Sequence, residues 1–206
     1  MTAINSIIHP EYVFIGMDSL AAFPETKEPY KFVTKIFPLI HLNMVICGTG
    51  IYQFICDWYF KFNCIVTEKE ISGVDKMAPC MLQSLWEKYK FGPNENSVST
   101  IFHFGYDAKE KYFRAFKYRS ENNFASEEYE CKNNVVTIIK PETDYEIEIA
   151  SLRIEDIPNI FKEILIKQRS DDMKLPQCNR FGIGGDLQIA CLTPSWISLQ
   201  SLKIEY

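Results

Sequence analysis

The sequence has no cluster of basic residues. Its 22 lysines and arginines are outnumbered by 27 aspartates and glutamates, and the 206-residue chain has a formal net charge of −5. The most basic stretch, residues 109–119, also contains Glu110 and several aromatic residues, which is typical of an exposed strand face. A nucleic-acid-binding domain carries a basic patch and a high pI. We therefore predict that nucleic acid is not a partner of this protein.

Long apolar runs are also missing. The most apolar segment, residues 36–60, is interrupted by proline, glycine and polar residues, whereas a membrane-spanning helix needs about 20 predominantly apolar residues. The N-terminal residues do not show the basic region and apolar stretch of a secretory leader. We therefore expect neither a membrane partner nor a signal peptide.

The cysteines and histidines form no recognisable ligand set. None of the seven cysteines makes a C-x-x-C pair, and most lie in apolar runs such as "VICG" and "IACL". The three histidines, His9, His41 and His103, are far apart in the sequence. Such a pattern is typical of reduced, buried thiols in a cytoplasmic protein. We expect no metal and no cofactor.

The residues that are present favour one sizeable core. Hydrophobic residues make up 47% of the chain, and a chain of this length is commonly a single domain. We therefore expect residues 1–206 to form one domain.

Strands are predicted at both ends of the chain and in its middle. "AINSII" and the nearly continuous apolar run "YVFIGM" are typical of two strands, and the second suits burial on both faces. "SLAAFPETKEPY" is expected to be a loop, followed by strands in "KFVTKIFPL" and "LNMVICGTG". "STIFHFGYD" and "YFRAFKY" predict a hairpin, and "VVTIIK" and "YEIEIA" predict further strands. Two more strands are expected around "TPSW" near the C-terminus.

Helices are predicted in three places. "IYQFICDWYFKFN" is amphipathic and aromatic, and a second helix is expected before Gly92, with Ser72 or Asp75 as its N-cap and Pro79 in its first turn or at a kink. "IEDIPNIFKEILIKQ" has apolar residues at helical spacing. The resulting order, strands, two helices, strands, one helix, strands, indicates an α+β protein with two sheets and outer helices.

The N-terminal hairpin offers two interpretations of Thr2. Thr2 is a good strand residue and could simply begin an edge strand, while Asp18 and Ser19 could make a turn. Thr2 could instead be a nucleophile that acts once Met1 has been removed.

Several motifs support the second interpretation. Asp18-Ser19-Leu20-Ala21 follows Thr2 by sixteen residues, and Lys35 lies in "VTKI". "CGTG" precedes the first helix, and "GGDLQI" lies near the C-terminus. In order and spacing these motifs resemble the N-terminal nucleophile hydrolases, and in particular the proteasome β-subunit and its bacterial relatives. The resemblance implies a four-layer αββα sandwich.

The resemblance also implies roles for particular residues. Thr2 would be the nucleophile and its free α-amine the base, since this amine has an ordinary pKa of about 7.7–8.0. Lys35 would keep the amine neutral, Asp18 would hold Lys35, and the backbone N–H of Gly48 would stabilise the oxyanion. Ser151 is the candidate for a supporting serine before the third helix. The substrate would be a peptide or a small amide.

Two departures favour a non-catalytic alternative. Arg180 and Ile183 stand where the active peptidases carry a supporting Asp and Ser. The same fold also serves non-catalytic subunits that assemble or bind partners, so a homo-oligomer is expected under either interpretation. The aromatic first helix could supply an assembly surface, although we favour its packing on the sheet.

Overall fold

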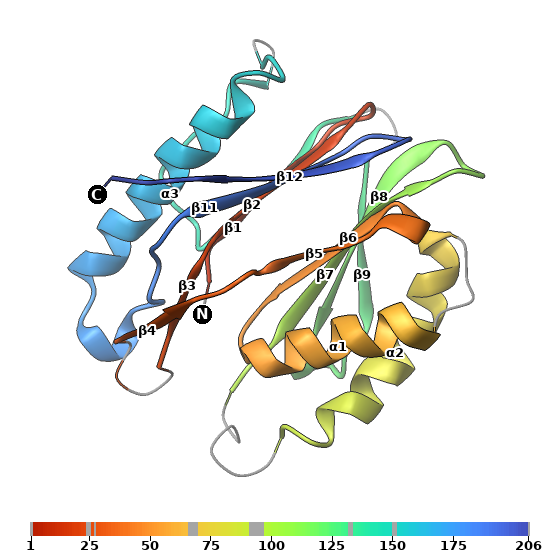
Figure 1. The fold of residues 1–206 in the computed structure, drawn as a ribbon, viewed down its shortest axis with the longest axis horizontal. Helices are drawn as coiled ribbons and strands as arrows, with labels where there is room; N and C mark the ends of the chain where they lie inside the picture. Colours follow the sequence, from red (N-terminus) through yellow and green to blue (C-terminus); the bar gives the residue numbers. More distant parts are fainter. Residues whose placement is uncertain are drawn as a thin grey trace.

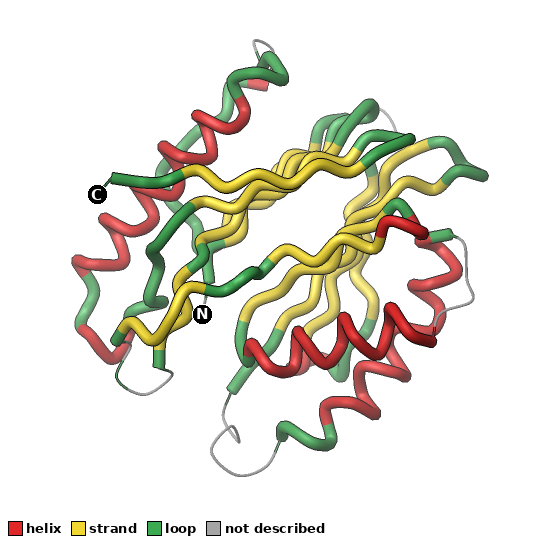
Figure 2. The backbone as a smooth tube through the Cα atoms, in the orientation of Figure 1, coloured by secondary structure: helices red, strands yellow, loops and turns green. Residues whose placement is uncertain are grey.

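The computed structural model describes residues 2–23, 26, 28–65, 70–90, 97–131, 134–149 and 152–205. Two five-stranded antiparallel sheets face each other, and helices cover their outer faces (Figure 1; Figure 2). One helix lies outside the first sheet and two lie outside the second. The structure therefore has the four-layer αββα arrangement expected from the sequence.

The first sheet contains both ends of the chain. Its strand order is β10-β1-β2-β11-β12, and all neighbours are antiparallel. The strands are β1 (Ile4–Ile8), β2 (Val13–Asp18), β10 (Val136–Lys140), β11 (Leu187–Leu192) and β12 (Ile197–Leu202). Every residue of β2 is buried, because one of its faces meets the second sheet and the other meets a helix. The apolar run "YVFIGM" is thus confirmed as a strand covered on both sides.

The second sheet has the order β5-β6-β7-β8-β9 and is also antiparallel. Its strands are β5 (Ile36–Leu39), β6 (Met44–Thr49), β7 (Thr100–Asp107), β8 (Tyr112–Arg119) and β9 (Ser126–Glu130). Outside it lie α1 (Tyr52–Ile65) and α2 (Ile71–Trp86). Short 3-10 turns lie at Ile40–Leu42, Ser120–Asn122 and Gln177–Asn179.

Three apolar clusters separate the four layers. The middle cluster fills the space between the sheets, with Ile15, Val45 and Phe104 fully buried. A second cluster lies under α1 and α2, where Phe54, Trp58 and Phe62 are fully buried. The aromatic residues of α1 therefore mainly pack on the sheet, as we favoured, although Phe60 of the same helix is 62% exposed.

The third cluster lies between the first sheet and α3 (Ile157–Lys174). Here α3 crosses β2 so closely that a Cβ on Gly16 would lie 2.5 Å from Phe161 Cδ2. A side chain at this position would force the Phe161 ring to move, so glycine allows the close packing of α3 on β2.

Three strand predictions were wrong. The loop after β2 contains a two-stranded ribbon, β3 (Leu20–Ala22) and β4 (Pro29–Phe32). Residues 145–149 form no strand, and β9 was not anticipated, because its "SEEYE" sequence carries too few apolar residues. The alternation in "YEIEIA" is typical of a strand, but Tyr145 and Ile147 pack beside α3 instead of joining a sheet.

The start of α2 was also placed too late. Its N-cap is Glu70, so both Ser72 and Asp75 lie inside the helix. Asp75 instead accepts hydrogen bonds from Tyr118 Oη at 2.8 Å and Ser126 Oγ at 2.5 Å. Pro79 lies in the helix interior rather than its first turn. Gly92, the expected end of the helix, lies outside the described residues.

A buried histidine sits in the cluster under α1. His103 is fully buried on β7, and its Nε2 accepts a hydrogen bond from Trp58 Nε1 at 2.9 Å. Because Nε2 is an acceptor, the neutral ring carries its proton on Nδ1, and that atom has no hydrogen-bond partner among the described residues. Burial lowers the pKa of His103 to about 3.

Because of His103, we expect the folded protein to lose stability in acid. The unfolded chain protonates histidine near pH 6.5, whereas folded His103 stays neutral down to about pH 3. The contribution of neutral His103 to the free energy of unfolding is therefore complete above pH 6.5 and is lost as the pH falls toward 3. At pH 5 the free energy of unfolding is lower by roughly 2 kcal/mol. Urea unfolding of wild type and His103→Phe from pH 7 to 4 measures the difference.

The control for this experiment is the double variant Trp58→Phe/His103→Phe, which also removes the indole donor that the single variant leaves unpaired. Both variants should show a weaker fall of unfolding free energy with acid than wild type. Parallel pH profiles in all three proteins would contradict the assignment of this acid sensitivity to His103.

Candidate active site

The candidate site lies where the first strand hairpin ends. In the β1–β2 pairing Ile4 faces Met17, and continuing this register places Ala3 opposite Asp18 and Thr2 beside Ser19. Asp18 Oδ1 accepts a hydrogen bond from the Ala3 backbone N–H at 2.9 Å. The hairpin register therefore holds Asp18 against Ala3, the residue that follows Thr2.

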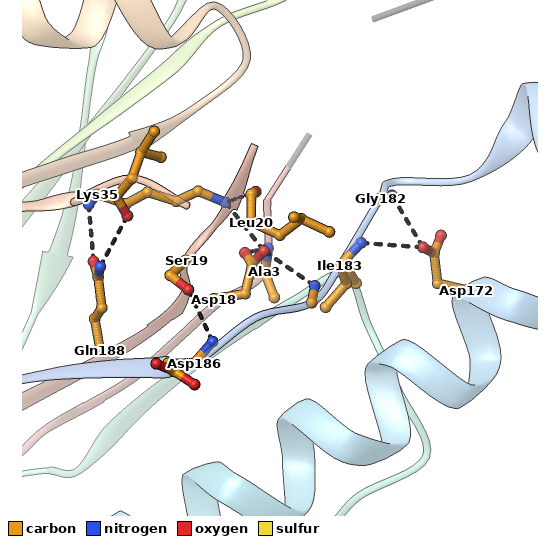
Figure 3. A network of polar contacts seen from close by, with 12 residues as sticks. Ala3, Asp18, Ser19, Leu20, Lys35, Asp172, Gly182, Ile183, Asp186 and Gln188 are labelled. Carbon is orange, nitrogen blue, oxygen red and sulfur yellow. Dashed lines mark hydrogen bonds and ion pairs between the residues drawn. The ribbon is translucent and has the colours of Figure 1, made fainter. Parts of the chain in front are cut away.

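A buried ion pair forms the centre of the site. Lys35 Nζ lies 3.1 Å from Asp18 Oδ2, and the two side chains are 5% and 0% exposed. Lys35 Nζ also donates to the Leu20 carbonyl at 2.6 Å. The Gly184 backbone N–H donates to Asp18 Oδ2 at 3.3 Å. Figure 3 shows Lys35 pointing toward Asp18 and Leu20, with Ala3 beside the Asp18 carboxylate.

Burial opposes the charge on both partners. It lowers the pKa of Lys35 below its ordinary value, although the Asp18 carboxylate acts in the other direction. Burial also raises the pKa of Asp18, against the lowering effects of Lys35 and of the Ala3 and Gly184 amides. Lys35 therefore binds its proton less tightly than an exposed lysine does, while Asp18 opposes this effect.

Lys35 is positioned by a residue that sequence reasoning missed. It lies directly before β5, and its backbone N–H donates to Gln188 Oε1 at 2.9 Å. Gln188 Nε2 in turn donates to the Val33 carbonyl at 2.8 Å (Figure 3). The side chain of Gln188, on β11, therefore holds the segment between β4 and β5. The available signal was a single polar residue within the apolar "LQIACL".

A second missed residue fixes the loop before β11. Asp172, near the end of α3, is 3% exposed and accepts hydrogen bonds from the backbone N–H groups of Phe181, Gly182 and Ile183. This loop supplies the Gly184 N–H that reaches Asp18. In the sequence, Asp172 lies in "RSDDMK", which has the composition of an exposed helix face and gave no sign of burial.

Ser19 ties the same loop to the hairpin. Its backbone N–H donates to the Asp186 carbonyl at 2.9 Å, and its Oγ accepts from the Asp186 N–H at 2.8 Å. The Asp18-Ser19 pair therefore joins the first hairpin to the loop before β11 as well as to Lys35.

A cavity of about 310 Å³ opens beside Thr2. Its lining residues come from both sheets and two loops: Thr2, Thr49, Lys140, Pro141, Glu142 and Phe181. Thr49 ends β6, and Gly48 lies immediately before it on the same strand. A Cβ on Gly48 would meet the Thr100 carbonyl oxygen at 2.6 Å and, more distantly, Ile55 of α1. Of these two residues, Thr49 lines the cavity.

Arg180 and Ile183 lie in the described part of the chain and serve other roles than support of Thr2. Ser151 and Met1 lie outside the described residues. Arg180 donates to the carbonyls of Leu175 and Met173 at the end of α3, and Ile183 is buried in the cluster under that helix. The Thr2 hydroxyl and Lys35 Nζ, both in the described part of the chain, are not hydrogen-bonded to each other.

The described residues show no metal-binding group of three or more His, Cys, Asp or Glu side chains. Nor does any helix in the described ranges combine the length and apolar character of a membrane-spanning segment.

The two facing sheets and their outer helices form a four-layer αββα fold that is shared with a known bacterial proteasome-like structure. Among solved structures, the chain is similar to an Anbu (Gly-1) mutant from Hyphomicrobium sp. strain MC1, with a TM-score of 0.70. The match covers 100% of this chain and 88% of that one, at 6% sequence identity. Anbu is a bacterial proteasome-like relative of the N-terminal nucleophile hydrolases. No protein-family model matches the sequence, and no curated protein matches it. The likeness is therefore one of fold.

Proposed function

We propose that this protein is a threonine-type amidohydrolase whose nucleophile is Thr2, freed by cleavage of the bond that precedes it. The observation that carries the proposal is the buried Asp18–Lys35 pair, which is held by Ala3, the residue next to Thr2. A buried ion pair is costly to form and is weak evidence for a stabilising role. Its position beside a nucleophile candidate favours a chemical one.

The proposed chemistry needs only groups of this chain. The Thr2 hydroxyl oxygen attacks the carbonyl carbon of an amide, and the free α-amine of Thr2 takes the hydroxyl proton. The Gly48 N–H stabilises the resulting oxyanion. When the tetrahedral intermediate collapses, the carbon–nitrogen bond of the substrate breaks, and the leaving amine takes the proton from the Thr2 α-amine. Water then hydrolyses the ester on Thr2 and restores the enzyme. Base assistance of this kind accelerates a reaction by roughly 10²–10⁴-fold.

The cavity beside Thr2 supports a substrate with an extended or small acyl part. Its volume of about 310 Å³ is at the lower end of small-molecule sites. Its mixed lining, with Phe181 on one side and the Lys140–Glu142 ion pair on another, suits a peptide or a small amide.

A non-catalytic role within the same fold is the second candidate. It is favoured by Arg180 and Ile183, which serve the end of α3 and the core instead of the nucleophile. In that case the Asp18–Lys35 pair would only fix the hairpin, and the protein would act through assembly or partner binding.

The seven cysteines are free, and Cys47, Cys131 and Cys191 are buried. Thiols kept in this state fit a reducing compartment. We infer a cytoplasmic location on that basis.

The amidohydrolase proposal is tested first at the N-terminus of the protein. Protein purified without a tag from cells should begin at Thr2, and intact-mass analysis shows whether it does. An electrophile that reacts with N-terminal threonine should then add one equivalent of mass, and peptide mapping should place it on residue 2. Quantitative retention of Met1, or modification at any other residue, would contradict the proposal and favour the non-catalytic role.

A further inference from the structure

The strand β12 is an exposed edge of the first sheet. Within the described residues it pairs only with β11. Its four central residues are all exposed, and Leu199 is 51% exposed. An edge strand presents unpaired backbone N–H and C=O groups, which can pair with another strand.

The other three edges carry features that discourage such pairing. The edge strand β9 has the sequence "SEEYE", and its Glu127 and Glu128 form ion pairs with β8. The edge strand β5 has only four residues and includes Pro38, which has no N–H to donate. The edge strand β10 ends in Lys140. Charged residues, proline and short length are the usual means of protecting a sheet edge.

The β12 edge has none of these protective features. The β11–β12 hairpin, residues 187–202, contains no charged residue and no histidine. Next to the edge, Trp196 is 50% exposed. A second copy of an uncharged strand can approach it without like-charge repulsion, which would not hold for β9.

We propose that β12 is a dimerisation edge that pairs antiparallel with β12 of a second copy. A two-fold axis perpendicular to the sheet makes the same strand complementary to itself. With the axis at Leu199, this residue faces Leu199 of the partner subunit, and Trp196 faces Leu202 of the partner subunit. Centring the axis at Gln200 instead would place Ile197 against Lys203 of the partner subunit, so the Leu199 register is favoured. The first sheet of one copy and the first sheet of the second copy then form one continuous sheet.

The first test introduces a charge at the proposed contact. Leu199→Lys would place two ammonium groups opposite each other, and it should raise the dimer Kd by about tenfold or more. The matched control is Thr137→Lys, which adds the same charge at an exposed position of β10, the other edge of the same sheet. Sedimentation velocity should show a dimer for wild type and Thr137→Lys and a monomer for Leu199→Lys. Circular dichroism confirms that each variant is folded.

The second test determines which residues of the two β12 strands face each other. In the proposed pairing the two Leu199 Cβ atoms lie about 4.5–5.5 Å apart, so Leu199→Cys should form an intersubunit disulfide under mild oxidation. Ser201→Cys lies on the same face of the strand, but its two copies would be about 13 Å apart, which is too far for a disulfide. Both variants are made with the exposed Cys64, Cys80 and Cys178 replaced by serine.

Each outcome decides the proposal, independently of any enzymatic activity. Loss of the dimer in Leu199→Lys alone, with cross-linking at residue 199 and not at 201, supports it. A wild-type protein that stays monomeric at high concentration overturns it, and so does a dimer that survives Leu199→Lys. Cross-linking at residue 201 in preference to 199 would also overturn it, as would binding of an unrelated extended peptide to β12 of a monomeric protein.

Discussion

Replacing Thr2 with alanine is expected to abolish amide hydrolysis and covalent labelling, with the rate falling on the order of 10⁶-fold, as when a hydrolase loses its nucleophile. The physical reason is that the proposed bond to the acyl carbon is made by the Thr2 oxygen. No other described hydroxyl lies with Thr2 in the lining of the cavity except that of Thr49. The measurement is the rate of amide hydrolysis, with intact-mass analysis after treatment with the electrophile.

The matched control is Thr2→Ser, which keeps the oxygen and the α-amine and removes only a methyl group. It should retain measurable hydrolysis and labelling. Because residue 2 is only partly buried, both variants should fold like wild type, and thermal unfolding checks this. Labelling of Thr2→Ala to the same extent as wild type would show that Thr2 is not the nucleophile.

Replacing Lys35 with methionine is expected to lower the free energy of unfolding by about 3–5 kcal/mol, the usual cost of removing one partner of a buried ion pair. Asp18 is fully buried and would keep only the Ala3 and Gly184 amides as hydrogen-bond donors. The uncompensated carboxylate, rather than the lost attraction, causes most of this loss. Urea unfolding at neutral pH measures it.

The double variant Asp18→Asn/Lys35→Met separates the ion pair from the packing. It removes both charges, so it should be more stable than Lys35→Met alone. With the single variant Asp18→Asn it completes a double-mutant cycle, which gives the coupling energy of the pair. The exposed pair Lys174–Asp171 provides a control: Lys174→Met should unfold much like wild type. Equal stabilities for Lys35→Met and Lys174→Met would contradict the burial argument.

The same variants also separate the two proposed functions. If Lys35 keeps the Thr2 α-amine neutral, Lys35→Met and the double variant should both lose hydrolysis even where the double variant regains stability. If the pair only fixes the hairpin, no activity exists to lose and only the stability changes will be seen.

Much of the fold could be predicted from local sequence patterns. The apolar run of β2, the aromatic alternation of β7 and β8 and the helical spacing in α3 each gave the correct element, because hydrophobic periodicity depends only on neighbouring residues. The errors also have local causes. The first turn of α2 lacks a side-chain cap that the sequence would reveal. The strand β9 pairs with β8 along its length, but among its described side chains only Tyr129 contacts the apolar core.

The site could be predicted only in part. The separation of Thr2 and Asp18 follows from one hairpin, whose register fixes which residues stand opposite each other. Gln188 and Asp172 could not be found in this way, since each acts on a segment distant in the sequence: Gln188 on the residues around Lys35, and Asp172 on the loop after α3.

The sequence by itself determined the order of the main strands and helices, the excess of acidic residues and the hairpin that brings the N-terminal residues to Asp18. These properties depend on residues close together in the chain. Only the tertiary structure decided that Lys35 and Gly184 meet at Asp18, that Asp172 is buried and that the uncharged strand β12 is an edge. Burial and sheet order depend on contacts between distant segments, which are formed when the two sheets and their helices pack together.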